Sequence, residues 1–189
     1  MTLLPFCEWL ASTRGSIALH QSLFMYPLVE STHVLALCLF LGMAVMMDLR
    51  LLGLTLRGVS MTEMKRRLGP WIAAGFVVMV ITGALLFYAI PIRSYQSIWF
   101  RMKAFALVLA GINAFIFHAT IDRRIAEWDV APVPPRAARR AAVTSLVLWA
   151  VVVVAGRMIA YNWFDCSKQP QPAIVNMLAE CNVPPAGAR

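Results

Sequence analysis

Three ionisable side chains, His33, Lys103 and Arg157, lie inside long apolar stretches of this 189-residue sequence. At about 1.5 Å of rise per helical residue, each lies about 9–10 Å from the same end of the membrane-spanning region. Ionisable residues at membrane depth are rare and usually functional. A neutral imidazole ligates haem iron, and cations at the same depth would neutralise the propionates. The sequence therefore predicts a haem b site, with His33 as an axial ligand and Lys103 and Arg157 beside the propionates.

The other two histidines extend this hypothesis. His20 precedes the same span on the same side, and a fold-back of the chain would bring its imidazole to the opposite face of the ring. It is therefore the candidate for the second axial ligand, or for a second metal ligand beside His33. His118 lies about 20 Å away along the membrane normal, so it predicts at most a separate cofactor site.

Simpler interpretations of these residues stay open. His33 is one helical turn from Glu30, so the two side chains would be able to form a packing hydrogen bond. Lys103 and Arg157 would be able to extend their charged ends to the outer interface. His20 alone is typical of a surface histidine. The shared depth of three ionisable residues on three spans is what favours the haem site.

The elements that must position these residues are membrane helices. Hydrophobic residues make up 60% of the chain and charged residues 14%, against about 45–50% and 25% in soluble domains. Four apolar runs are long enough to cross a bilayer as helices: about 27–50, 70–90, 97–121 and 142–164. The sequence thus predicts an all-α integral membrane four-helix bundle over residues 27–164, and it excludes a nucleic-acid-binding protein or an ordinary soluble enzyme.

The basic residues indicate how the spans are oriented. Ten of the 17 Lys and Arg residues belong to the connections after the first and third spans. They are Arg50, Arg57, Lys65, Arg66, Arg67, Arg123, Arg124, Arg136, Arg139 and Arg140. By the positive-inside rule these connections face the cytoplasm. Both termini are then expected on the periplasmic side of a bacterial inner membrane, and much of the net charge of +8 reports topology.

Two segments lie outside the spans. Residues 1–26 carry large apolar side chains without the features of a cleavable signal peptide, so we expect them to lie on the outer membrane surface or to fold over the bundle mouth. Residues 165–189 form a periplasmic tail that contains Cys166 and Cys181. A disulfide between them would close a loop of about 16 residues and stabilise the tail by roughly 3 kcal/mol. Unpaired thiols, or competition from Cys7, are the alternatives.

Several short motifs resemble those of a known group of membrane proteins. The first span has a histidine near its outer start, a central glycine and an Asp-Leu-Arg-Leu exit, and the third has an early lysine and a late aromatic-His pair. These are His33, Gly42, Asp48–Leu51, Lys103 and Phe117–His118. Over residues 26–164 the chain resembles the four-helix proteins around copper-resistance protein D and the HemJ-type protoporphyrinogen oxidase. It is most similar to an uncharacterised bacterial membrane family with a Glu-x-x-His motif, here Glu30 and His33.

The resemblance implies haem b bound through helix histidines, with the matching positions His33, Lys103 and His118. Phe117 stands where a Tyr is usual, and the spacing from Lys103 to His118 is about a turn longer. These departures argue against protoporphyrinogen oxidation more than against haem binding. Copper-resistance protein D implies copper handling instead.

We therefore expect a haem-b electron-transfer protein rather than an enzyme. Its partners would be quinone or a periplasmic redox protein, and it would act alone, as a homo-oligomer or as the anchor subunit of a larger membrane complex. The first alternative is a copper-binding or copper-transport protein, because thiol and thioether ligands select Cu(I). Its candidate ligands are His20, His33, Glu30, Cys7 and Met25. The second alternative is a structural subunit without a cofactor.

Overall fold

The computed structural model describes residues 2–129, 131, 133–161, 164, 166 and 169–181. The regular secondary structure of these residues is helical, and four of the helices are long and apolar enough to cross a membrane. They are α3 (Met25–Leu51), α4 (Met61–Ala89), α6 (Ile98–Ile116) and α7 (Arg136–Tyr161). Two short helical turns, η1 (Phe117–Ile121) and η2 (Asp122–Glu127), prolong α6. The predicted class, an all-helical protein with four helices long and apolar enough to span a membrane, is confirmed.

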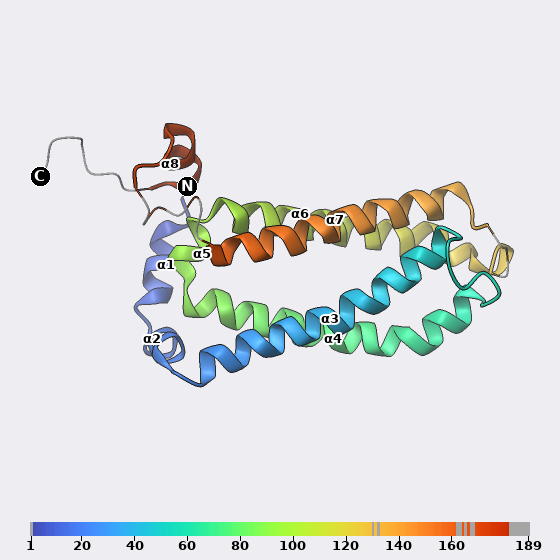
Figure 1. Cartoon of the computed structure of the whole chain (residues 1–189), viewed down its shortest axis with the longest axis horizontal. Coiled ribbons are helices and arrows are strands. Elements are labelled where there is room, and N and C mark those ends of the chain that lie inside the picture. Colours follow the sequence, from blue (N-terminus) through green and yellow to red (C-terminus); the bar gives the residue numbers. More distant parts are fainter. Residues whose placement is uncertain are drawn as a thin grey trace, which may run out of the picture.

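The long helices are arranged as two antiparallel pairs, α3 with α4 and α6 with α7, joined by packing of α3 on α7 (Figure 1). Phe40 of α3 lies at the centre of this arrangement. A β-carbon on Gly75 of α4 would lie only 3.2 Å from the Phe40 backbone nitrogen, so the glycine permits the close approach of α3 and α4. The Phe40 ring meets Trp149 of α7 edge-on, with 4.8 Å between ring centroids. One aromatic side chain therefore connects the two pairs.

The observed helix boundaries differ from the predicted spans on the arginine-rich side. α4 begins at Met61 rather than at Pro70, which lies inside the helix. The Ser60 hydroxyl accepts a hydrogen bond from the Glu63 amide at 3.1 Å and so caps this earlier start. Met61 is also fully buried, which favours the extra turns. Because apolar runs mark only the membrane-embedded part of a helix, they underestimate the length of α4.

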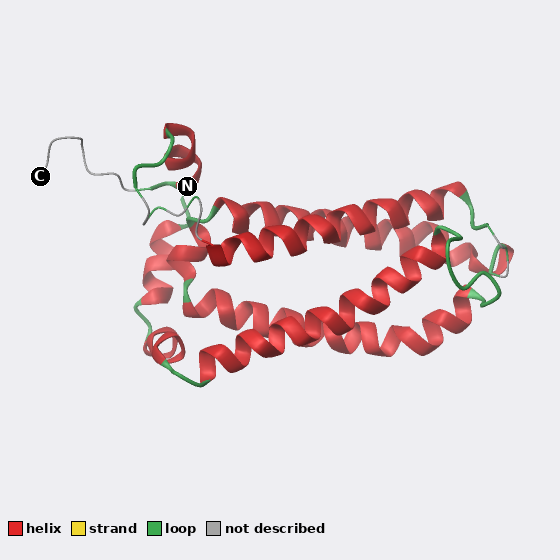
Figure 2. Ribbon diagram, viewed as in Figure 1, coloured by secondary structure: helices red, strands yellow, loops and turns green. Residues whose placement is uncertain are grey.

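The N-terminal segment forms two short helices, α1 (Leu4–Ala11) and α2 (Arg14–Gln21). They pack across one end of the bundle against α3, α4 and α5 (Pro91–Tyr95), as Figures 1 and 2 show. The Ser16 hydroxyl donates to the Tyr88 carbonyl at 2.7 Å, and the Thr13 and Tyr88 hydroxyls are 2.8 Å apart. Of the two arrangements expected for this segment, the structure therefore has it folded over the bundle mouth.

At the opposite end, one buried arginine holds the two long connections together. Arg50 is fully buried at the end of α3. Its Nε donates to the Val59 carbonyl at 2.9 Å, and its Nη2 donates to the Ala131 carbonyl at 3.3 Å. Although the sequence places Arg50 among the charges that set topology, its contacts show that it also has a structural role.

Candidate functional site

His33 is attached to the neighbouring helix through a single ring nitrogen. It projects from α3 toward α4, where its Nδ1 lies 2.9 Å from Oγ1 of Thr82. Thr82 is buried, with 7% of its surface exposed, and His33 is half-buried. The expected alternative, a hydrogen bond from His33 to Glu30, is not present among the described contacts. The imidazole instead joins the two helices of the first pair.

The hydrogen bonds of Thr82 bear on which ring nitrogen of His33 carries the proton. The Thr82 hydroxyl lies 2.7 Å from the Val78 carbonyl and 3.2 Å from the Met79 carbonyl, one turn back. When its proton goes to one of these carbonyls, its oxygen accepts from His33, and Nδ1 is the protonated nitrogen. In this tautomer Nε2 has the free lone pair. Metal-binding histidines are typically held in this way.

Glycines of α4 and α7 allow the imidazole and the lysine to lie close to the helix backbones. A β-carbon on Gly83 would lie 3.2 Å from Cε1 of His33, and one on Gly156 would lie 3.6 Å from Nζ of Lys103. Lys103 is close enough to act electrostatically on His33. Within the described residues Lys103 has no acidic partner. The structure thus places Lys103 within electrostatic range of His33.

Arg157 and His20 do not join this layer through any described contact. Arg157 is exposed, and its Nη2 donates to the Tyr161 hydroxyl at 3.1 Å, with the guanidinium over the Tyr161 ring. His20 is exposed at the end of α2, and its ring meets Tyr26 edge-on at 6.2 Å. Local partners hold both side chains, and no described contact links either of them to His33.

His118 belongs to a second polar cluster, near the arginine-rich end. Its Nδ1 lies 3.1 Å from Oδ2 of Asp122, and Lys65 of α4 forms an ion pair with the same oxygen at 2.5 Å. His118 lies in η1, a π-helical turn, which is a feature common at functional sites. Because Lys65 and Asp122 already neutralise each other, this cluster is explained as a contact between α4 and the end of α6.

The residues proposed as copper ligands do not form a cluster. Among the described residues, no group of three or more His, Cys, Asp and Glu side chains is placed to hold a metal ion. Cys7 is buried in α1, and burial together with the nearby Glu8 raises the pKa of its thiol. A protonated thiol is a poor ligand and a poor nucleophile. Met25 and Glu30 are exposed at the start of α3.

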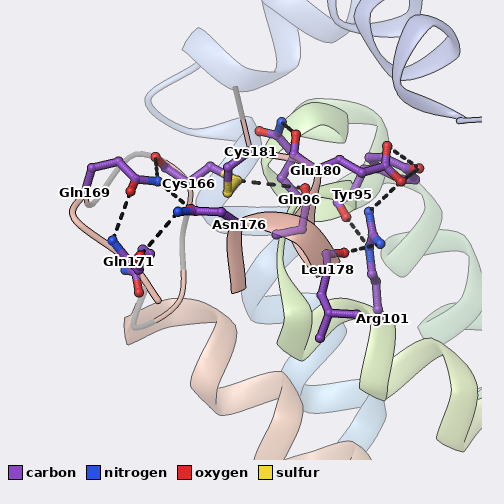
Figure 3. The surroundings of a disulfide bond; sticks show 11 residues. Tyr95, Gln96, Arg101, Cys166, Gln169, Gln171, Asn176, Leu178, Glu180 and Cys181 are labelled. Carbon is purple, nitrogen blue, oxygen red and sulfur yellow. Dashed lines mark hydrogen bonds and ion pairs between the residues drawn. A yellow bond between two sulfur atoms is a disulfide. The ribbon is translucent and has the colours of Figure 1, made fainter. Parts of the chain in front are cut away.

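A disulfide and a glutamate hold the C-terminal tail against the bundle (Figure 3). Cys166 and Cys181 are bonded, as their positions predicted, on either side of α8 (Ala173–Ala179). Glu180 accepts a hydrogen bond from the Tyr95 hydroxyl at 3.0 Å and pairs with Arg101 at 3.6 Å. Figure 3 shows these side chains converging from the tail, α5 and α6. Residues 182–189 of the predicted tail lie outside the described residues.

Sequence reasoning missed the hydrogen bond between Thr82 and His33 and the contact of Lys103 with Gly156. A hydroxyl at the depth of a membrane histidine was the available signal for Thr82. For Gly156, the signal was a glycine on α7 at the depth of Lys103.

Comparison with known proteins gives a family but no function. The model of a family described as a family of unknown function (DUF6644) matches residues 6–162. No curated protein and no solved structure matches the chain.

Proposed function

The chain belongs to the DUF6644 family, whose function is unknown, and we propose from the site itself that it is a haem-b-binding electron-transfer protein of the bacterial inner membrane. The supporting observation is the geometry of His33. Its Nδ1 is held by Thr82, so Nε2 is the nitrogen available to ligate iron. The haem would lie between the two helix pairs, as cofactors do in other four-helix bundles.

Lys103 fits the second requirement of such a site. Its ammonium lies against Gly156 and acts electrostatically on His33 without an acidic partner among the described residues. An unpaired cation in an apolar bundle is costly, and a haem propionate would remove that cost. Bound haem would supply reversible one-electron chemistry. Its protein environment would supply the axial nitrogen and the neutralising charge.

The site offers one strong axial ligand, since His20 packs on Tyr26 and His118 pairs with Asp122. The sixth coordination position of the haem iron would be filled by His20 after a movement of α2 or by a residue of a partner protein. Otherwise it would have no protein ligand. We infer that the arginine-rich end faces the cytoplasm. His33 then lies near the periplasmic side, where quinone or a periplasmic redox protein would exchange electrons with it. A role as the anchor subunit of a larger complex or as a homo-oligomer is compatible with this site.

An absorption spectrum of the detergent-purified protein, taken beside elemental analysis, tests the proposal. We expect a Soret band, α and β bands after reduction, and iron near one equivalent or below. His33→Ala should abolish these bands, whereas His118→Ala, the matched histidine variant at the other end, should keep them. Protein that is colourless when made in haem-sufficient cells would exclude the proposal. Copper without iron would favour copper handling, and absence of both would favour a structural subunit.

A further inference from the structure

A second polar site lies at the arginine-rich end, far from His33. An open groove with a volume of about 580 Å³, lined largely by exposed side chains, lies there between the end of α3 and the first turns of α7. Its lining consists of Leu52, Arg136, Arg139, Arg140, Val143 and Thr144. Three cationic side chains, one hydroxyl and two aliphatic side chains thus surround one space. This volume lies within the range of about 300–1,000 Å³ that is typical of small-molecule sites.

Arg136, Arg139 and Arg140 have no acidic partner among the described residues, in contrast to four other basic residues of this end. Most nearby cations are paired. Lys65 pairs with Asp122, and Arg124 pairs with Glu127 at 2.9 Å. Arg66 and Arg67 both bind Glu63. The groove therefore gathers three cations that no described acidic side chain neutralises.

The position of the arginines on α7 makes this charge more unfavourable. They occupy the first turns of the helix, where the macrodipole is positive and acidic residues are preferred. α7 has no acidic residue in its first turn. An external anion bound in the groove would offset both the mutual repulsion of the guanidinium groups and their repulsion by the dipole.

The same helix face continues as an apolar surface. Arg139 and Arg140 lie three and four residues after Arg136, and Val143 lies four residues after Arg139, so these side chains share one helix face. Val147 lies four residues further along, and Val143 and Val147 are 50% and 57% exposed. A ligand in the groove would thus meet cations at the membrane boundary and a hydrocarbon-facing surface just below it. This is the polarity of an anionic phospholipid, with a phosphate headgroup and acyl chains.

We propose that this groove binds the phosphate headgroup of an anionic phospholipid. The guanidinium groups of Arg136, Arg139 and Arg140 donate to the phosphate oxygens. The Thr144 hydroxyl adds a further donor, and one acyl chain lies along Val143 and Val147. The site is independent of haem. It also agrees with the inferred orientation, because anionic lipids concentrate in the cytoplasmic leaflet.

Native mass spectrometry of the full-length purified protein, titrated with phosphatidylglycerol or phosphatidylcholine, tests this proposal. We expect preferential retention of phosphatidylglycerol. The triple variant Arg136→Gln, Arg139→Gln, Arg140→Gln should lose affinity for it by about tenfold or more. The matched control is Arg66→Gln, Arg67→Gln, Arg124→Gln, which removes the same charge from the same end but only from paired arginines. It should change the affinity by less than about twofold.

The outcomes distinguish a specific lipid-binding site from nonspecific electrostatic attraction between the protein and anionic lipids. Equal losses in the two triple variants, or equal retention of the two lipids, would overturn the proposal. Inorganic phosphate that displaces phosphatidylglycerol at low millimolar concentration would identify a free-phosphate site, and it would also overturn the assignment to lipid. Circular dichroism checks folding. If the triple variant does not fold, single Arg139→Gln and Arg140→Gln variants must each weaken phosphatidylglycerol binding for the proposal to stand.

Discussion

The Nδ1 nitrogen of His33 and the Oγ1 oxygen of Thr82 are 2.9 Å apart, and this contact joins α3 to α4. When Thr82 donates its proton to the Val78 carbonyl of its own helix, His33 is the donor. The contact fixes the orientation of the imidazole, and in this arrangement Nε2 carries the free lone pair.

Replacing Thr82 with valine should weaken haem binding. Thr82→Val preserves the side-chain shape but removes the acceptor for Nδ1, so the tautomer and ring orientation are no longer fixed. Loss of such an outer-shell partner reduces metal affinity by about 10–100-fold. Haem titration of the purified variant, followed at the Soret band, measures the change. Thr32→Val is the matched control, because the Thr32 hydroxyl makes the same backbone hydrogen bond, to Leu28 at 2.7 Å, and not a hydrogen bond with the His33 ring.

Adding a methyl group at Gly83 should displace the imidazole. The new β-carbon of Gly83→Ala would lie 3.2 Å from Cε1 of His33, so the ring must shift away from α4. We expect lower haem occupancy and an altered reduced spectrum. Gly111→Ala is the control, since a β-carbon there meets nothing within 4 Å. If the two variants retain haem equally, the close approach of Gly83 to His33 does not position the ligand.

The two cations predicted to neutralise propionates should behave differently. Lys103→Met should lower the haem midpoint potential and reduce haem retention, because a nearby positive charge disfavours the more positive ferric state. Arg157→Met should leave both nearly unchanged, because the Arg157 guanidinium is exposed and bound to Tyr161. Redox titration under spectroscopic detection compares the variants. If Arg157→Met changes the midpoint potential or the haem retention more than Lys103→Met does, the propionates lie on the outer side of α7.

Loss of the disulfide should loosen the C-terminal tail while leaving the helix bundle folded. A double variant, Cys166→Ser with Cys181→Ser, should destabilise the closed tail by roughly 3 kcal/mol through greater entropy of the open chain. Limited proteolysis should then cut near α8 much faster than in the parent protein. Cys38→Ser removes a free thiol of α3 and serves as the control. An unchanged cleavage rate would show that the contacts of Glu180 with Tyr95 and Arg101 are sufficient to hold the tail.

The sequence predicted the general architecture because membrane insertion depends on local composition. A helix needs about 20 apolar residues to cross a bilayer, and that requirement can be read from one stretch at a time. The same locality explains the error at Pro70. The start of α4 depends on the cap at Ser60 and on burial of Met61 beneath other helices, and the hydropathy of the span contains neither.

The sequence alone predicted four helices long and apolar enough to span a membrane, the charge asymmetry between their ends and a shared depth for His33 and Lys103. Depth follows from position along one helix, because helical rise is fixed. Rotation about the helix axis and contact between helices are not fixed in this way. Only the tertiary structure showed that His33 meets Thr82, that Lys103 lies against Gly156, and that Arg157 turns to Tyr161. Such contacts arise from packing between distant segments. The depth of each residue along its helix was therefore enough to suggest candidates for the site, but only the packing shows which of them interact.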